Sequence, residues 1–363
     1  MDSDWSLWAN GSHGDDHPSR NDRVPRVMHI ITVVLFLVTF ALGVLGNGLV
    51  LWVTAFRMRR TVNTVWYFSL AMADFPFTLL LPLSAAYQVL GTHWPFGLAM
   101  CKLTSGLSVL TMFASVLTLV AISVDRCVVV VFPVWSQNRR GPGLAVLACA
   151  LVWFLSIVLS LPTFLYRDTF QEDNNTICFT NFLTAKEDAS LELIEDEDEE
   201  AWAAIDALMA SRFFWFSLSR ILGGFVIPFT VIGVSYAILC LRLRHHRLAS
   251  RPGGSKPFRI MAAVVTAFLV CWLPYHAILL TEICLPVGEP LPLALELATP
   301  LASGLAALNS CLNPLLYVWV GRHFRFRLCH SLPRILEQAL TEDTGRSSKT
   351  RSSLLGEGAS TIV

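Results

Sequence analysis

Uncharged stretches as long as a lipid bilayer is thick recur along this chain, and they limit its fold more than any other feature. A helix that crosses the hydrocarbon needs roughly 20 apolar residues. Seven such stretches lie between flanking charges, at residues 27–56, 61–101 (broken only by Asp74), 103–124, 141–166, 221–241, 260–281 and 297–321. Only 15% of the 363 residues are charged, few for a soluble protein. We therefore expect an all-α membrane protein, a seven-transmembrane helix bundle, rather than a large soluble helical core.

Basic residues predict the orientation, because the Lys and Arg residues of short loops stay cytoplasmic. They follow the first, third, fifth and seventh stretches, whereas the loops after the second and sixth carry none before Lys102 and Arg322. We therefore expect a multi-pass plasma-membrane protein with an extracellular N-terminus and a cytoplasmic C-terminus. The acidic, polar first residues do not fit a cleaved signal peptide.

The same patterns divide the chain into four parts. Residues 1–26 are expected to form an extracellular, glycosylated N-terminus, and residues 27–321 the bundle, with an acidic second extracellular loop at 166–211. Residues 322–338 read as a short amphipathic eighth helix on the membrane surface. Residues 339–363 read as a disordered cytoplasmic tail whose serines and threonines can be phosphorylated and then bound by an arrestin.

Covalent chemistry agrees with this orientation. Asn10 and Asn174 head glycosylation patterns on the predicted outer side. Cys101 and Cys178 also lie on that oxidising side, so we expect them to form a disulfide. Cys329 follows an amphipathic run just inside the membrane and is a candidate for palmitoylation.

Several classes of membrane protein do not fit the sequence. A retinal protein needs a lysine inside a helix, but all four lysines lie outside the seven stretches. A transporter would usually show repeated broken helices and several buried acids, whereas Asp74 is the only deep acid. No spacing suggests a nucleophile, a metal cluster or an acid–base pair, so an enzyme is not expected, nor is a nucleic-acid partner. A receptor remains.

Short motifs, about one per stretch and in order, support this conclusion. They are Asn47 in "GNGLV", Asp74 in "LAMAD", "DRC" at 125–127, Trp153, "CWLPY" at 271–275 and "NPLLY" at 313–317. Together they resemble the rhodopsin-like (class A) G-protein-coupled receptors over residues 27 to about 338. Stretches such as "HWPFG" (93–97) and "YRDT" (166–169) are similar to the chemoattractant branch, nearest its chemerin-receptor-like and formyl-peptide-receptor-like members.

The resemblance implies roles for individual residues. It implies coupling to a heterotrimeric G protein through Asp125, Arg126, Tyr236, Pro274, Asn313, Pro314 and Tyr317. It also implies an allosteric sodium ion, and no other cofactor, held by Asp74, Ser115 and Asn309. A protonated Asp74 that only accepts and donates hydrogen bonds is the alternative. Membrane lipids are expected to contact the basic cytoplasmic rim.

The chain departs from the family pattern in two places. No acid stands in "RPGGSKP" (251–257), where many relatives have one to hold the arginine of the Asp-Arg pair. We therefore expect Asp125 to be the main restraint on Arg126. The stretch Leu107-Ser108-Val109 lacks the acid that formyl-peptide receptors place there, which argues against recognition of formyl-methionine.

Two features indicate the ligand. Arg220 lies inside a predicted helix, where an arginine is costly and needs an anion, either from the ligand or from a neighbouring acid. Residues 187–206 contain ten acids and no base. We expect a peptide or small protein of basic character, whose carboxylate binds Arg220 near Glu282, Trp272 and His276, with signalling through an inhibitory G protein. A carboxylate lipid mediator, or a non-signalling or arrestin-biased decoy receptor, is the alternative.

Overall fold

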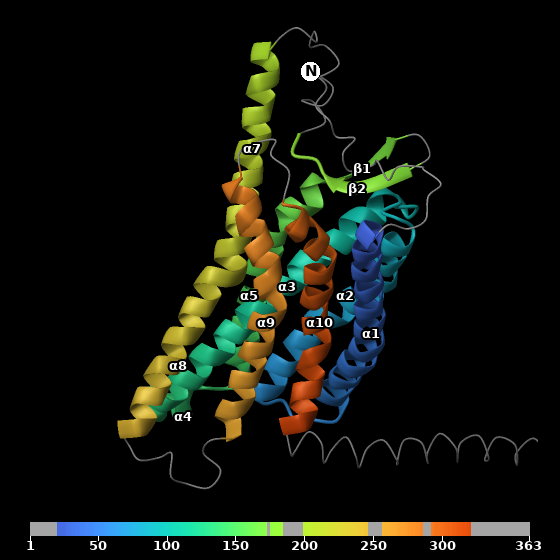
Figure 1. Ribbon diagram of the computed structural model, residues 1–363. Helices are drawn as coiled ribbons and strands as arrows, with labels where there is room; N and C mark the ends of the chain where they lie inside the picture. Colours follow the sequence, from blue (N-terminus) through green and yellow to red (C-terminus); the bar gives the residue numbers. More distant parts are fainter. Residues whose placement is uncertain (1–19, 173–174, 184–198, 246–255, 286–291, 321–363) are drawn as a thin grey trace, which may run out of the picture.

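The computed structural model describes residues 20–172, 175–183, 199–245, 256–285 and 292–320. Within these ranges seven long helices stand side by side, if the continuous rod formed by α7, the π-helical turn η2 and α8 is counted once (Figure 1). The seven rods are α1 (Arg20–Phe56), α2 (Val62–Val89), α3 (Gly97–Val131), α5 (Pro142–Tyr166), α7–η2–α8 (Glu199–Ile221, Leu222–Val226, Ile227–His245), α9 (Lys256–Cys284) and α10 (Leu293–Val320). The predicted seven-helix fold is confirmed.

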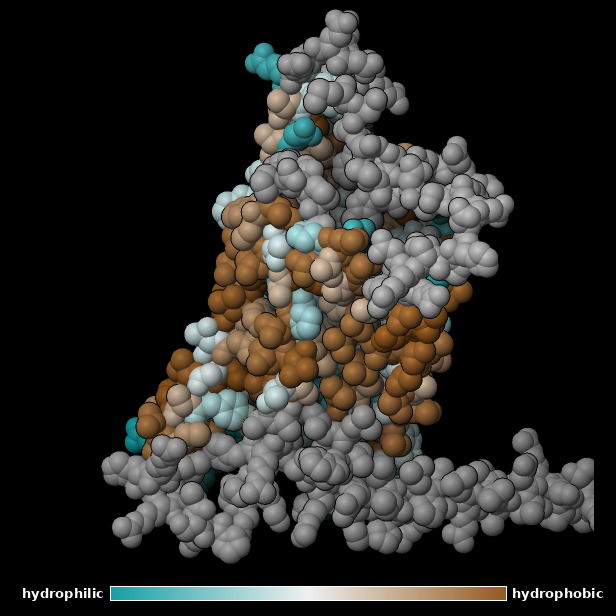
Figure 2. Space-filling view, viewed as in Figure 1, coloured by the Kyte–Doolittle hydropathy of each residue, from teal (hydrophilic) through white to brown (hydrophobic). Residues whose placement is uncertain are grey.

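Six of these rods are long and apolar enough to cross a membrane over their described residues. The seventh, α10, packs between α1 and α9 but carries Glu296, Asn309 and Asn313, which lower its hydropathy. Hydrophobic residues cover much of the visible flank of the bundle, while hydrophilic ones gather near the tip of α7 (Figure 2). This distribution suits a bundle whose sides face lipid.

The two ends of the bundle differ. One end, called here the hairpin end, carries an antiparallel hairpin of β1 (Arg167–Glu172) and β2 (Asn175–Thr180) (Figure 1). The opposite end, the α4 end, carries the short helix α4 (Pro133–Arg139). The predicted disulfide between Cys101 and Cys178 is present, and it ties β2 to the start of α3. The hairpin is thereby held over the bundle.

Helix ends depart from the sequence-based boundaries. Helix α7 begins at Glu199, inside the predicted loop 166–211, and α1 begins at Arg20, inside the predicted N-terminal segment. Alanines 201, 203 and 204 favour helix, so the rod continues beyond the membrane. The length of a charge-free stretch therefore predicts the part of a helix that crosses the membrane, and not the full length of the helix. Asn10, Asn174, Cys329, the predicted helix 322–338 and the predicted tail lie outside the described residues.

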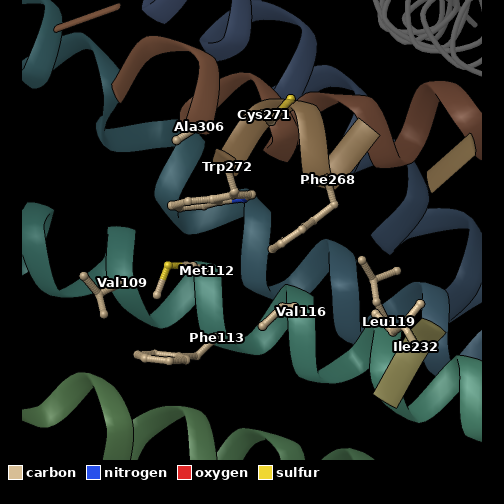
Figure 3. Close-up of a cluster of buried hydrophobic side chains, with 10 residues drawn as sticks. All are labelled: Val109, Met112, Phe113, Val116, Leu119, Ile232, Phe268, Cys271, Trp272 and Ala306. Carbon is tan, nitrogen blue, oxygen red and sulfur yellow. The ribbon is translucent and has the colours of Figure 1, made fainter. Parts of the chain in front are cut away.

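The main core cluster lies among α3, α8, α9 and α10. Trp272 and Phe268 project from α9 toward the α3 residues Met112 and Val116 (Figure 3). In lipid, such helices associate through close packing rather than through exclusion of water. Gly106 shows how close: a Cβ there would lie 2.2 Å from the ring of Phe164 on α5. A larger residue at 106 would push α3 away from α5.

Candidate functional site

A cavity of about 180 Å³ opens at the hairpin end between α7, α9 and α10. Its walls are mainly apolar and aromatic, with a few polar groups among them. The lining residues are Thr180, Phe182, Phe213, Phe216, Ser217, Arg220, Tyr275, Ile278, Leu279, Glu282, Thr299 and Ala302. An apolar pocket with a few converging polar groups is the usual form of a ligand site. The structure thus brings two predicted ligand residues, Arg220 and Glu282, into one cavity.

Arg220 is held in place entirely by neutral groups. One guanidinium nitrogen donates to the Tyr275 hydroxyl and another to Oγ1 of Thr163, each at 3.1 Å, and the group lies 4.3 Å from the centre of the Phe216 ring. Its Nε is buried without a hydrogen-bond partner. Among the described residues no acid lies within 4.0 Å of it, although Glu282 lines the same cavity. The guanidinium is therefore fixed in position without a direct ion pair, although Glu282 is close enough to interact with its charge.

A second arginine stands close to the first. Arg167 is the first residue of β1, and it donates a long 3.4 Å hydrogen bond to the carbonyl of Cys178. Burial and the neighbouring charge of Arg220 lower the pKa of Arg167 to about 10. The side chain is still charged at neutral pH, so two positive charges face this region together. Such a pair favours an anion.

The sequence analysis missed Arg167 as a site residue. A signal was present, since Arg167 is the first charge after the stretch 141–166 and stands in "YRDT". Ser217 was missed as well. Its side chain is fully buried, it lines the cavity, and its hydroxyl has no hydrogen-bond partner among the described residues. The cavity therefore offers an unsatisfied hydroxyl beside an unsatisfied arginine N–H.

Trp272 and His276 lie deeper than expected. Both side chains are buried and neither lines the cavity. Nδ1 of His276 hydrogen-bonds the Trp272 carbonyl at 3.0 Å, and the imidazole stacks on Phe225 with 4.9 Å between ring centres. The two residues connect the cavity region to the core, and direct contact with a ligand stays a prediction for them.

At the α4 end the arginines have partners. Arg140, which follows α4, donates to both carboxylate oxygens of Asp125, from Nε at 2.7 Å and from Nη2 at 2.9 Å. This pairing raises the pKa of Arg140. The Nε of Arg126 stays 3.9 Å from Asp125, and its Nη2 instead donates to the side-chain oxygen of Asn63 on α2.

One expectation is corrected by this geometry. Asp125 is not the main restraint on Arg126, because its carboxylate is already engaged by Arg140. A bidentate arginine contact is shorter and stronger than a 3.9 Å ion pair. Asn63 provides the closer contact for Arg126.

A third polar centre lies midway along the bundle. Asp74 is fully buried, and its two carboxylate oxygens accept hydrogen bonds from Ser115 at 3.2 Å and from Asn313 at 2.9 Å. No described basic residue lies within 4.0 Å of it.

Comparison with known proteins identifies the architecture. The sequence pattern of the 7 transmembrane receptor (rhodopsin family) matches residues 46–195 and 201–317. The chain belongs to the rhodopsin family of seven-transmembrane receptors. It is therefore a multi-pass plasma-membrane receptor and not an enzyme, with an extracellular ligand and a G protein as the partners that the family implies.

Individual relatives place the receptor within this family. It is 41% identical to chemerin-like receptor 1 of Bos taurus over 89% of this chain and 86% of that one. It is 40% identical to the C3a anaphylatoxin chemotactic receptor of Oncorhynchus mykiss over 95% and 87%, and 36% identical to formyl peptide receptor 2 of Mus musculus over 97% and 96%. The predicted place in the chemoattractant branch is confirmed.

The remaining predicted switch residues of the receptor lie along α8, α9 and α10. Pro274 and Pro314 lie inside α9 and α10, and the half-buried Tyr236 packs against the main core cluster. Tyr317 belongs to α10, but its side chain is not among those described. A Cβ at Gly46 would lie 2.9 Å from Pro314, so α1 and α10 make close contact there.

Proposed function

We propose that the receptor binds a chemoattractant peptide or small protein and signals through a heterotrimeric G protein of the inhibitory class. One observation carries the ligand proposal. Arg220 lines a cavity, the charge of Arg167 is close enough to interact with it, and no described acid lies within 4.0 Å of either. A carboxylate supplied by the ligand would neutralise this charge, and the free end of a polypeptide provides one.

The size of the cavity favours a peptide end over a lipid. About 180 Å³ is slightly more than the ~150 Å³ cavity that holds one benzene, and less than the roughly 300–1,000 Å³ that encloses a drug-sized ligand. It fits one terminal residue next to Arg220. The rest of a peptide would then extend toward the hairpin and α7, whereas a long-chain lipid mediator would need a larger enclosed volume.

Charge outside the cavity supports a ligand of basic character. Helix α7 opens with Glu199 and Glu200, which belong to the acidic stretch 187–206. Acids at the start of α7 attract a basic segment over about 10 Å at physiological salt. The relatives are named for chemerin, C3a and formyl peptides, which also favours a polypeptide ligand. Leu107-Ser108-Val109 still argues against formyl-methionine.

Transmission would run through α9. Pro274 removes a backbone hydrogen bond and creates a flexible point one turn from the cavity residue Ile278. A ligand that favours a second arrangement of this helix would shift the equilibrium between two states. Arg126 would then leave Asn63, and Tyr236 and Tyr317 would turn toward it, which opens the α4 end to the G protein.

A sodium ion fits the polar centre. The oxygens of Asp74, Ser115 and Asn309 are hard donors of the kind that alkali and alkaline-earth cations prefer, and Asp74 lacks a described basic partner. These three residues would hold the ion, which supplies a positive charge at the centre of the resting bundle. The hydrogen bonds from Ser115 and Asn313 keep the carboxylate oriented in either case.

The test is a cAMP and arrestin assay of cells that express the receptor, with C-terminal peptides of chemerin and C3a, formyl peptides and carboxylate lipids as probes. We expect a peptide acid to lower cAMP and the matching C-terminal amide to be far weaker. Pertussis toxin should abolish the fall in cAMP. A lipid as the only agonist would favour the lipid alternative, and arrestin recruitment without any change in cAMP would favour the decoy.

A further inference from the structure

Asp125 lies between two arginines, and the structure shows which one holds it. Arg140 contacts both carboxylate oxygens, at 2.7 and 2.9 Å, while Arg126 reaches only to 3.9 Å. The side chains are sheltered, with 13% of Asp125 and 23% of Arg140 exposed. An ion pair in this setting is screened less by water and salt than one on the surface.

The position of Arg140 is set by its own segment. Its backbone N–H donates to the carbonyl of Ser136 at 3.0 Å, which closes α4, and Pro142 starts α5 two residues later. Arg140 thus connects α4 and the start of α5 to the end of α3. Its neighbour Arg139 is exposed, and no contact between its side chain and Asp125 is found.

Among the described residues, only Asp125 forms an ion pair with Arg126. The sequences of α8 and α9 contain no acid before Glu282, which lies at the hairpin end. Its nearest acceptor is Asn63, in the first turn of α2. That turn is fixed by Thr61 and Thr64, which cap it reciprocally, with the Thr61 amide donating to the Thr64 hydroxyl at 2.8 Å.

We propose that Arg140 is a positioning residue for Arg126. Because Arg140 binds the Asp125 carboxylate, Arg126 is left to donate to Asn63. The contact between Arg126 and Asn63 then joins α3 to α2 and stabilises the resting state. This goes beyond the proposed function, since it depends neither on the ligand nor on the class of G protein. Activation must then break the contact between Arg126 and Asn63, whereas Asp125 stays with Arg140. Without Arg140, the free carboxylate would take Arg126.

Two double-mutant cycles on the purified full-length receptor test this, with the melting temperature as the readout. One cycle measures the coupling between Asn63 and Arg126, using Asn63→Ala and Arg126→Gln. The other measures the coupling between Asp125 and Arg126, using Asp125→Asn and the same Arg126→Gln. Each cycle is run in the parent and in the Arg140→Ala background, and Arg139→Ala is the matched control. Where Arg140→Ala expresses poorly, Arg140→Lys replaces it, because lysine keeps a charge but loses the two-point contact.

In the parent we expect the effects of the Asn63 and Arg126 substitutions on the melting temperature to be non-additive by on the order of 5 °C. For Asp125 with Arg126 we expect only a small non-additive change in the melting temperature. Arg140→Ala should reverse this order, lowering the first coupling and raising the second. Arg140→Lys should fall between, and Arg139→Ala should change neither. A merely stabilising Arg140 would leave both couplings as they are in the parent. That result, or an equal effect of Arg139→Ala, would overturn the proposal.

Discussion

The two ends of the receptor hold their half-buried arginines in different ways. At the α4 end, Arg140 donates to both carboxylate oxygens of Asp125, and Arg126 donates to the side-chain oxygen of Asn63. At the hairpin end, Arg220 rests on hydroxyls and an aromatic ring, and Arg167 on a backbone carbonyl. A charge that is neutralised within the protein holds a conformation. A charge that is positioned but not neutralised is ready for a ligand, and it costs stability until the ligand arrives.

Loss of the disulfide should have the largest effect on agonist binding, because the disulfide holds the hairpin that carries Arg167 in place. Cys178→Ala frees β2 from α3 and lets the hairpin, with Arg167, move away. Loss of a native disulfide costs roughly 2–5 kcal/mol, so we expect little surface expression and no measurable agonist binding in a radioligand assay on intact cells. Cys240→Ala, an exposed free cysteine of α8, is the control. Normal binding by Cys178→Ala would show that the hairpin does not form the site.

Removing the better-placed arginine comes next. Arg220→Ala leaves the ligand carboxylate desolvated and without its main partner, which costs roughly 2–5 kcal/mol, or about 30-fold to several thousand-fold in affinity. Arg220→Lys keeps the charge and should lose less. Competition binding of a peptide acid and its C-terminal amide measures how much affinity the ligand carboxylate contributes. In the Arg220→Ala variant the acid should no longer bind more tightly than the amide. An advantage that persists would place the carboxylate elsewhere.

Arg167 should have a smaller effect with a pH signature. The pKa of Arg167, about 10, lies below the ordinary arginine value. The charged form therefore lowers the free energy of unfolding below pH 10, and this cost is relieved as the pH rises past 10. An anionic ligand needs the charged form. Agonist affinity should therefore be flat from about pH 7 to 9 and decline through about pH 10. Arg167→Gln should bind roughly tenfold more weakly and lose this decline; an unchanged pH profile would separate Arg167 from the ligand.

The acidic run should matter least, because it acts at long range. Changing Glu195, Asp196, Glu197, Asp198, Glu199 and Glu200 to the matching amides leaves the arginine pair intact. For a basic peptide we expect association about threefold slower at physiological salt, a weaker salt dependence and little change in the dissociation rate. Surface plasmon resonance on receptor in nanodiscs measures both rates. A change confined to dissociation would mean that these acids contact the bound ligand.

The sequence predicted features that depend on local composition better than contacts between residues that are distant in the chain. Membrane crossings and the pairing of Cys101 with Cys178 follow from composition and sidedness, so both were predicted correctly. Arg220 and Glu282, which flank two of the charge-free stretches, line one cavity, and their contact with a ligand stays a prediction. Arg167 was missed because its position depends on a hairpin that folds back over the bundle, which no local pattern encodes.

The partner of Asp125 could not have been predicted for a different reason. Arg126 is adjacent in sequence and comes within 3.9 Å of the Asp125 carboxylate, but it donates its hydrogen bond to Asn63. Arg140 is distant in sequence, yet the turn after α4 brings it to both carboxylate oxygens. When two arginines compete for one acid, only the three-dimensional geometry decides which of them pairs.

The central claim is that Arg220 at the hairpin end has no direct ion pair, whereas Arg140 at the α4 end has one. It can be tested without any ligand. The measurement is the melting temperature of purified receptor carrying the same substitution, Arg220→Met or Arg140→Met, at either end. Methionine keeps an unbranched apolar stem like that of arginine and removes the charged guanidinium. We expect Arg220→Met to keep or raise the melting temperature of the ligand-free receptor and Arg140→Met to lower it by several degrees, since it strands Asp125. A fall for Arg220→Met as large as that for Arg140→Met would contradict the account.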